Sequence, residues 1–463
     1  MPVGLRRDLG ALESYATLIG ILIGAGIFKV TSQAWALTGP SVILGYVILA
    51  PAILATSVAY SVFLSTPLGR LPGGEYTHLS RTFGGHGIAF VGAWLKIISY
   101  IGALAFLASA FGDYVNELLG RRGAPTLPLA VASLVAFYAI HVAGVRWFGR
   151  IQVWMCALLG LSLIVLIAPG VFAIRPTNYR PFFTHGAIGF AASLPSLFFA
   201  YAGFESLAQT AGEVRDSTRR LPGIFLRGIS VTTLIYFLMS LVSFGVLPGE
   251  RLRAAAAPMT EVASQYLPAG AAALVTLGAI MAITTSLNAT MLVPSRVAIM
   301  LAEDRLAPQW LARVWSRTGT PAIGLTITFL VALLLLISHQ ISLALNIAVF
   351  ALVVLYFLHS LALFVLPWAN GELFQSVTVH IPLSVQRAAA LVSMICMGAL
   401  IALQIVDDIG VLRRLSFRQR IAQSSITTIE LVLFWGAIGA FMYWIAHSRA
   451  ARGVENAEKA KLA

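Results

Sequence analysis

Long uninterrupted apolar runs constrain this chain more than any other feature. A run of about 20 apolar residues is long enough to cross a bilayer as one helix. Barrel strands would instead alternate apolar and polar residues. The sequence therefore predicts an all-α integral membrane protein with about 12 transmembrane helices. The predicted spans are residues 12–37, 40–65, 86–115, 126–143, 147–172, 187–211, 225–247, 271–302, 321–338, 341–367, 386–407 and 427–447.

Composition agrees with this class and excludes others. Hydrophobic residues make up 59% of the chain and charged residues 11%, against about 25% charged in an ordinary soluble domain. These values exclude a soluble globular enzyme and a disordered chain. The two cysteines, Cys156 and Cys396, lie in apolar runs and indicate no disulfide framework. The net charge of +13 fits basic loops on the cytoplasmic side, so we expect no nucleic-acid partner.

Loop charges predict the orientation in the cytoplasmic membrane. With the N-terminus inside, the cytoplasmic segments hold 18 Lys and Arg residues and the outer loops hold 10, the bias that cytoplasmic loops normally carry. Both termini are therefore expected in the cytoplasm, although the basic run 413–420 opposes this for the last two spans. The predicted parts are a cytoplasmic N-terminus (1–11), a transporter core of helices 1–10 (12–367), helices 11–12 (386–447) and a cytoplasmic tail (448–463).

Two predicted spans are interrupted near their middles. The first holds Gly20, Gly24 and Gly26, and the sixth holds Gly203 followed by Glu205. Each glycine costs a helix about 1 kcal/mol relative to alanine. Close helix packing through small residues is the alternative explanation. Interrupted segments at matching positions of two inverted five-helix halves, however, indicate a transporter binding site.

Such breaks would offer two poles to a ligand. Amides after Ala25 would lie at the positive end of a half-helix and suit a carboxylate. Carbonyls around Ile23 and at 199–202 would suit an ammonium group or a cation. Two such poles a short distance apart describe a zwitterionic α-amino acid.

Several motifs in order resemble the amino acid–polyamine–organocation (APC) superfamily of transporters. The resemblance implies a leucine-transporter-type fold, a five-plus-five inverted repeat with discontinuous helices 1 and 6. It also implies secondary transport of amino acids by alternating access. The motifs are Ile23–Phe28, Leu71–Tyr76 with Phe83–Gly84, Gly144–Arg146 with Gly149–Gln152, Phe199–Glu205 with Glu213–Arg215, and Ser295–Arg296 with Ala302–Pro308.

The resemblance also implies the residues of a substrate site. Ala25 and Gly26 would hold the carboxylate, Ile23 and carbonyls of the sixth helix would hold the amine, and Phe199 would be an aromatic gate. The substrate-binding set is Ile23, Gly24, Ala25, Gly26, Phe199, Ala200, Tyr201, Ala202, Gly203 and Glu205. The side-chain pocket would be lined by Ser99, Gly102, Ala103, Ala289 and Asn346.

The coupling ion stays open at this point. Many proton-coupled members of the superfamily have a lysine in helix 5, and Leu159 stands there in this chain. A sodium site like that of leucine-transporter-type symporters would comprise Gly20, Ile23, Ala282, Thr285 and Ser286. The alternative is that no sodium binds there and that the hydroxyls of Thr285 and Ser286 donate to carbonyls of the helices. Proton coupling through Glu205 or another group, and uncoupled exchange, are the alternatives, and no other cofactor is expected.

The expected substrate is a neutral, small to medium L-amino acid. Glu205 is the only carboxylate that the sequence places beside it, and Lys96 is expected to snorkel to the headgroups. The alternative is a transporter or exchanger of cationic amino acids or polyamines. A channel or a membrane enzyme is more remote, because the chain has no filter-like segment and no catalytic motif of the common membrane hydrolases. Besides substrate and lipid bilayer, no partner is indicated, and the oligomeric state is open.

Overall fold

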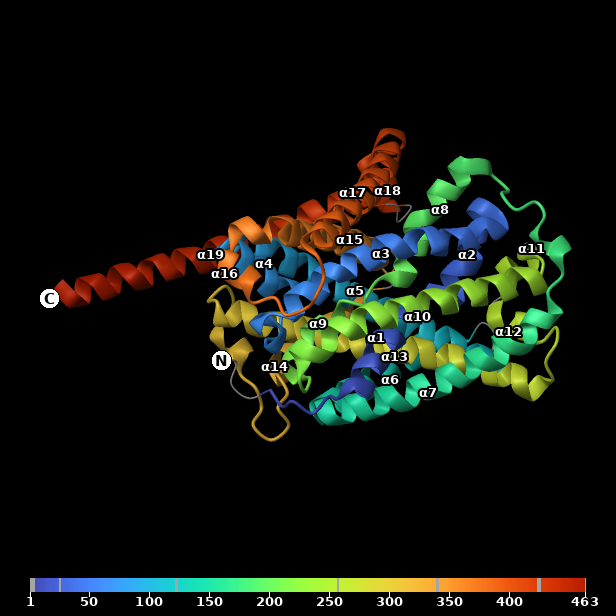
Figure 1. Cartoon of the computed structure of the whole chain (residues 1–463), viewed down its shortest axis with the longest axis horizontal. Helices are drawn as coiled ribbons and strands as arrows, with labels where there is room; N and C mark the ends of the chain where they lie inside the picture. The colour runs from blue at the N-terminus through green and yellow to red at the C-terminus, as the bar shows by residue number, and fades with distance from the viewer. Residues whose placement is uncertain are drawn as a thin grey trace.

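The fold is a bundle of long helices that run side by side along the longest axis of the molecule (Figure 1). The computed structural model describes residues 5–24, 26–120, 124–255, 258–338, 341–422 and 426–462. Within these ranges, regular structure is helical apart from the isolated β-bridges Leu9–Val214 and Trp315–Thr320. The predicted all-α class is confirmed.

The described residues contain a helix for each of the twelve predicted spans. Nine are long and apolar enough to cross a membrane, and three shorter apolar helices complete the set. The nine are Ala11–Phe28, Ala34–Leu64, Gly87–Leu118, Val145–Ala173, Ser217–Val246, Ala269–Glu303, Ala348–Ala369, Leu383–Arg414 and Thr428–Ala446. The shorter ones are Leu127–Val142, Gly186–Phe198 and Ala322–Ile337.

The first ten spans form two halves with the same order of elements. Each half has a broken helix, two long helices, a short helix and a further long helix. In the first half these are α1 (Ala11–Leu22) with η1 (Gly26–Val30) and α2 (Thr31–Thr38), then α3 (Val42–Leu64), α5 (Gly87–Leu118), α6 (Leu127–Val142) and α7 (Val145–Gly170). In the second they are α8 (Gly186–Tyr201) with α9 (Ser206–Gln209), then α10 (Ser217–Val246), α13 (Ala269–Glu303), α14 (Ala322–Ile337) and α15 (Ile341–Ala369).

Corresponding helices of the two halves pack against one another. The pairs α3–α10, α5–α13 and α6–α14 are all in contact, and α6 and α14 each have 16 residues. The broken helix α1 packs on α7, α10 and α13, and residues beside the two breaks, such as Leu22 and Ala200, are buried. This arrangement places both breaks in the interior of the bundle.

The remaining helices lie outside the two halves or in the connections. α17 (Leu383–Arg414) packs on α15 and α3, and α19 (Thr428–Leu462) packs on α15 and α5. Short helices fill the longer connections: α4 (Glu75–Phe83), α11 (Gly249–Ala254), α12 (Pro258–Ala263), α16 (Gly371–Gln375) and α18 (Phe417–Ala422), besides short 3-10 turns.

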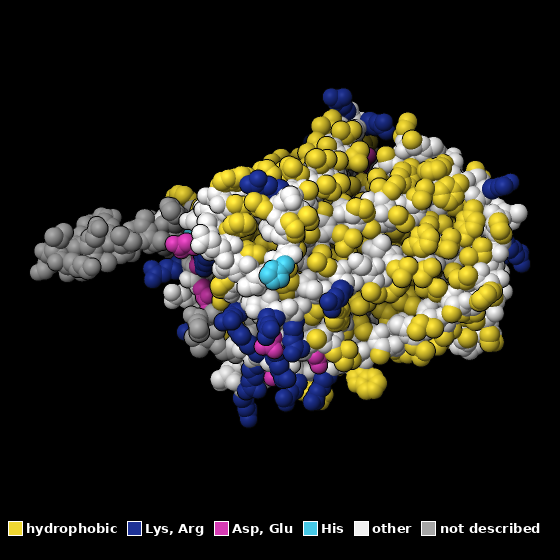
Figure 2. Space-filling view, viewed as in Figure 1, with side chains coloured by type: hydrophobic (Ala, Val, Ile, Leu, Met, Phe, Trp, Pro, Cys, Tyr) yellow, Lys and Arg dark blue, Asp and Glu magenta, His cyan; other side chains and the backbone are white. Residues whose placement is uncertain are grey.

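Both ends of the chain lie at the same end of the bundle, which we call the terminal face (Figure 1). α4, α9 and α16 lie at this end, whereas α11 and α12 lie at the opposite end. In the space-filling view, Lys and Arg side chains gather near the terminal face, and apolar side chains cover much of the remaining visible surface (Figure 2). Side chains such as Trp154, Ile188 and Phe434 are 78%, 86% and 69% exposed, as expected for contact with lipid.

Candidate functional site

The first helix breaks where the sequence predicts. α1 ends at Leu22, the amide of Gly24 turns back to the Leu22 carbonyl at 2.8 Å, and the chain resumes as a π-helical turn from Gly26. A Cβ atom on Gly26 would lie 2.7 Å from Cα of Ala200, and one on Gly24 would lie 2.2 Å from Oγ of Ser286. A side chain at Gly26 would therefore collide with backbone, and one at Gly24 would require Ser286 to move. Ala25 lies outside the described residues.

The second break follows α8. Gly203 has a φ of +103°, a conformation that glycine adopts easily and other residues avoid. Its amide donates to Oε2 of Glu205 at 3.0 Å, so the Glu205 side chain satisfies backbone that the break leaves free. The side chain of Phe199 is not among those that the structure describes, so its role as an aromatic gate stays a prediction.

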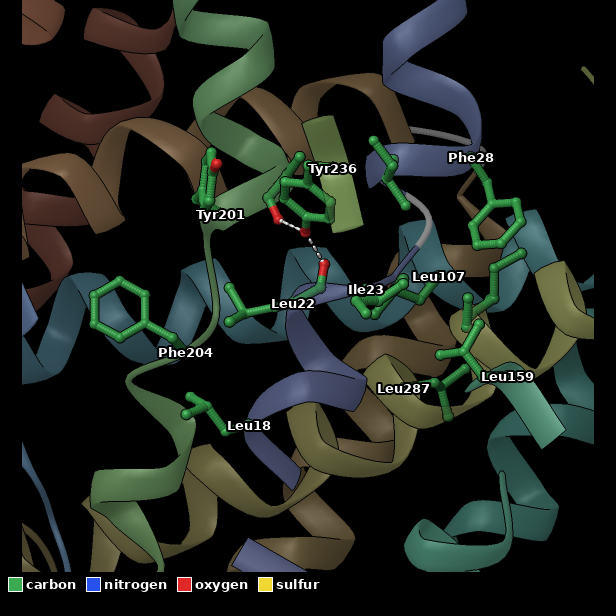
Figure 3. Close-up of a cluster of buried hydrophobic side chains, with 14 of the residues drawn as sticks. Leu18, Leu22, Ile23, Phe28, Leu107, Leu159, Tyr201, Phe204, Tyr236 and Leu287 are labelled. Atoms are coloured by element: carbon green, nitrogen blue, oxygen red, sulfur yellow. Dashed lines mark hydrogen bonds between the residues drawn. The ribbon is translucent and has the colours of Figure 1, made fainter. Parts of the chain in front are cut away.

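Tyr236 of α10 joins the two broken helices. Its hydroxyl faces the carbonyl oxygens of both Leu22 and Ala200 within hydrogen-bond distance. The close-up shows this hydroxyl between the two broken helices (Figure 3). The ring of Tyr201 lies 4.9 Å from that of Tyr236, and its hydroxyl donates to the Tyr46 carbonyl at 3.1 Å. Sequence reasoning gave no signal for Tyr236, because its partners lie far away in the chain.

A cavity lies between the two breaks. Its lining is apolar apart from four hydroxyls and backbone, and no charged side chain of the described residues lines it. The lining residues are Ile21, Leu22, Gly24, Gly26, Ser99, Tyr100, Ala103, Leu107, Ala200, Ala202, Gly203, Ser286, Thr290 and Leu352.

Some predicted pocket residues line this cavity and others do not. Ser99 and Ala103 of α5 line it with Leu107, because residues four apart share a helix face. Gly102 and Ala289 do not line it. Each lies three residues after a lining residue, on a part of the helix turned by roughly 60°. Ile23 is buried but also off the lining, and the side chain of Asn346 lies outside the described residues.

Glu205 lies next to the cavity, behind two of the residues that line it. It is fully buried, and its two oxygens accept hydrogen bonds from Tyr100 of α5, at 2.6 Å, and from Tyr356 of α15. Since Tyr100 and Gly203 line the cavity and both bond to Glu205, the carboxylate lies directly behind the cavity wall. Glu205 is not itself among the lining residues, and its predicted role in substrate binding stays a prediction.

A second buried carboxylate lies beyond this layer. Glu75, at the start of α4, accepts hydrogen bonds from Lys96 of α5 and Gln209 of α9, each at 2.6 Å, and from Tyr60 of α3. Gly74 makes this possible, because its φ is +46° and a Cβ there would lie 2.0 Å from Nε2 of Gln209. Four elements therefore meet at one carboxylate.

The prediction that Lys96 snorkels to the headgroups is wrong. The residue is 1% exposed, and its side chain ends at Glu75. The ammonium also lies 5.4 Å from the ring centroid of Tyr100. A buried partner therefore replaces water for this charge, and nothing in the sequence near Lys96 indicated one.

Two histidines pack beside this cluster. Nδ1 of His78 and Nε2 of His359 are 2.9 Å apart, and the His359 ring lies 4.2 Å from that of Tyr60. Burial, and then the positive charge of Lys96, lower the pKa of His78 to about 3. His78 is therefore neutral at physiological pH.

The predicted sodium site brings α1 and α13 together. The hydroxyl of Thr285 donates to the carbonyls of Gly20 and Ala282, both at 2.8 Å, and that of Ser286 donates to the Ile21 carbonyl at 3.0 Å. This is the hydroxyl-to-carbonyl bonding that we left open as the alternative to sodium. Sodium binding at these residues stays a prediction.

Leu159, at the position of the expected helix-5 lysine, is part of the apolar core. It is 1% exposed and lies near Leu287 in the close-up (Figure 3). The structure thus places no ammonium group at this point, and the charged groups nearest the cavity are those around Glu205 and Glu75.

Comparison with known proteins gives one family over nearly the whole chain. The family model described as amino acid permease matches residues 9–445. A branched-chain amino acid permease of Bacillus subtilis is 26% identical over 69% of this chain and 72% of its own length. A methylthioribose transporter of the same organism is 28% identical over 71% and 74%. A vacuolar cationic amino acid transporter of Arabidopsis thaliana is 28% identical over 69% of this chain and 56% of its own length.

Proposed function

The chain belongs to the amino acid permease family and transports amino acids across a membrane, and we propose that its substrates are neutral L-amino acids. We further propose that it lies in the cytoplasmic membrane with both termini inside, and that it works by alternating access. The observation that carries the substrate class is the cavity between the two helix breaks, whose described lining contains no charged side chain.

The two breaks supply the groups that an α-amino acid needs. The backbone from Gly24 to Gly26 is proposed to hold the carboxylate at the start of a helical turn. Carbonyls of the sixth-helix break, with Ile23, are proposed to hold the amine. Ala200 supports this role, because its carbonyl already accepts one hydrogen bond from Tyr236 and keeps a second lone pair.

The side-chain pocket favours a neutral substrate over a cationic one. Ala103, Leu107 and Leu352 offer apolar contact, and Ser99 and Thr290 add hydroxyls. The nearest carboxylate, Glu205, already accepts from two tyrosines and a backbone amide. A buried cationic side chain would therefore lack a free partner, which is costly in a membrane.

Counterflow in proteoliposomes tests this proposal. Vesicles loaded with unlabelled L-leucine should accumulate labelled L-leucine and L-alanine in a saturable way. L-serine should compete, and L-arginine, L-lysine and putrescine should compete at least tenfold less well. Stronger competition by L-arginine or L-lysine would show a cationic substrate class, and absence of counterflow with every amino acid would overturn the function itself.

Replacing Na⁺ by K⁺ in the same assay tests the predicted sodium site, and sodium dependence that Thr285→Val removes would support it.

A further inference from the structure

We propose that three arginines beside the start of α7 bind the headgroup of an anionic phospholipid. They are Arg146 and Arg150 of α7 and Arg317 of the connection between α13 and α14, and we call them the arginine cluster. None of them lines the substrate cavity. The site is therefore separate from the transport site, and the inference goes beyond the proposed function without resting on it.

The exposed residues of α7 lie on one side of the helix. At 3.6 residues per turn, the exposed positions from 146 to 168 fall within about 100° of its circumference. The buried residues of α7 lie on the opposite side, and the helix packs against α1 and α13. α7 therefore has one continuous outer surface, which we call the α7 stripe. Its members are Arg146, Trp147, Arg150, Trp154, Ala157, Leu161, Ile164 and Ala168.

Charged and apolar residues occupy different parts of the α7 stripe. Both arginines lie at its beginning, and every member after Arg150 is apolar. Trp154, Leu161 and Ile164 are 78%, 50% and 64% exposed. The segment from Arg150 to Ala168 covers about 27 Å at 1.5 Å per residue, close to the roughly 30 Å of hydrocarbon in a bilayer. The arginines therefore lie at headgroup level when the apolar part lies in hydrocarbon.

A turn of the connection after α13 brings the third arginine to this end of α7 (Figure 1). The β-bridge between Trp315 and Thr320 closes the turn, and Arg317 is exposed on it. The Thr320 hydroxyl donates to a carbonyl at the end of α6 at 3.1 Å. A Cβ atom on Gly144, the residue before α7, would lie 3.1 Å from the Thr318 carbonyl oxygen. The turn is therefore fixed beside the first residues of α7.

The arginine cluster has no acidic partner among the described residues. Other arginines near the terminal face do, as Arg81 pairs with Asp304 at 3.1 Å. The carboxylate of Glu13, which packs beside Gly149 of α7, accepts instead from the Gly10 amide at 2.9 Å. The guanidinium groups of the cluster thus keep their hydrogen-bond donors and their charge for a ligand.

A phosphate headgroup matches these free donors. A guanidinium presents five N–H donors in a planar fork that fits two phosphate oxygens at once. The guanidinium carbon of Arg150 lies 5.7 Å from the ring centre of Trp147, which is 51% exposed, and tryptophan is typical of the headgroup level. Basic clusters beside membrane helices attract anionic lipids.

The apolar part of the α7 stripe favours a lipid over a soluble phosphate. It begins one turn after Arg150, at Trp154, and continues without a charged residue. The segment from Arg150 to Leu161 covers about 16 Å, and one leaflet of hydrocarbon is about 15 Å deep. A lipid held by its headgroup can therefore lay an acyl chain along the same helix, which inorganic phosphate cannot do.

Quenching of tryptophan fluorescence by brominated lipids tests the proposal. The whole protein is placed in phosphatidylcholine vesicles with a small fraction of lipid brominated in its acyl chains, either phosphatidylglycerol or phosphatidylcholine. Because bromine quenches the tryptophans that it contacts, the apparent binding constant of brominated phosphatidylglycerol should exceed that of phosphatidylcholine about fivefold or more. Trp154→Phe should remove most of this excess quenching, since Trp154 would lie against the bound chain.

A triple variant and a matched control separate this site from general attraction by charge. Replacing all three residues of the arginine cluster by glutamine should make the two binding constants equal. The control removes three charges from exposed positions of α10, with Arg219→Gln, Arg220→Gln and Arg227→Gln together, and should keep the wild-type preference. Millimolar glycerol phosphate, a soluble headgroup, should not displace the brominated phosphatidylglycerol.

Several results would overturn the proposal. Equal constants for the two lipids in the wild type would show no selective site. An equal loss in the α10 control would show attraction by charge in general, and an unchanged preference in the triple variant would place the site elsewhere. Displacement by glycerol phosphate, or excess quenching that persists in Trp154→Phe, would exclude an acyl chain on the α7 stripe.

Discussion

Gly26, at the first break, both permits close helix packing and lines the proposed binding site. From the sequence, these two roles were alternatives. Gly26 permits close packing, because a Cβ there would meet the backbone of Ala200 at 2.7 Å. It also lines the cavity, as Ala200 does. The packing contact is made between the two broken helices themselves, so a substitution at Gly26 affects the site and the packing together.

Substitution of Gly26 should therefore abolish binding. In Gly26→Val, the added methyl groups would push apart η1 and α8 and fill the space next to the cavity, so leucine binding by scintillation proximity should fall at least tenfold. The matched control is Gly160→Val on α7, where nothing lies within 4 Å of an added Cβ, and it should bind normally. Gly26→Val protein that elutes as a monodisperse peak and binds with wild-type affinity would refute the assignment.

Side-chain partners were the least predictable part of the site. Ser99 and Ala103 follow from helical spacing, and the breaks follow from the glycines. Tyr236 and the Lys96–Glu75 pair depend on contacts between α10 and two broken helices, and between α5 and a connection. Such contacts form only when distant segments pack, and local sequence carries no record of them.

At the scale of elements, an ion pair fixes the connection after α9 against α13. Arg296 bonds to both oxygens of Glu213, at 2.8 and 3.3 Å, and both side chains are almost fully buried. The same connection bonds to the N-terminal segment, where the Leu9 amide donates to the Glu213 carbonyl at 3.1 Å. The second broken helix is thus anchored at the terminal face by side chain and backbone.

Loss of one partner from this pair should destabilise the protein. Arg296→Met would leave Glu213 buried without a counterion, which costs about 3–5 kcal/mol, and the melting temperature in detergent should fall by several degrees. Arg220→Met is the comparison, because Arg220 pairs with Asp216 at an exposed site and such pairs contribute little. Equal melting temperatures for the two variants would contradict the proposed anchoring.

Element boundaries show what hydropathy can and cannot predict. The twelve spans and the two interruptions were predicted because apolar length and glycine are local signals. The short helices α4, α11 and α12 were not, since they lie in connections whose helical form depends on docking against the bundle. α4 matters most for function, because it carries Glu75 and His78.

At the scale of the whole molecule, both chain ends share the terminal face (Figure 1), and the loop charges predict that this face lies in the cytoplasm. Labelling with a membrane-impermeant maleimide in intact cells tests this orientation, in a background where Cys156 and Cys396 are replaced by serine. His185→Cys, at the exposed start of α8, should react from outside. Gln375→Cys, exposed on α16, should react only after the cells are opened.

The reverse labelling pattern would invert the topology and place the basic terminal face outside. Labelling of both positions in intact cells would point to leaky cells, which a cytoplasmic marker protein controls for. The basic run 413–420 opposed the predicted orientation only for the last two spans, and both tested positions precede these spans.

The Tyr236 hydroxyl carries one proton and faces two carbonyl oxygens, those of Leu22 and Ala200. At this one point between the two breaks, two acceptors therefore share a single donor. An ammonium group has three donor protons and no lone pair, so it would supply the missing hydrogen-bond donors. A hydroxyl or an ester in the same place would add further acceptor lone pairs. The count of donors and acceptors at this point therefore predicts a preference for amines, whatever side chain the substrate carries.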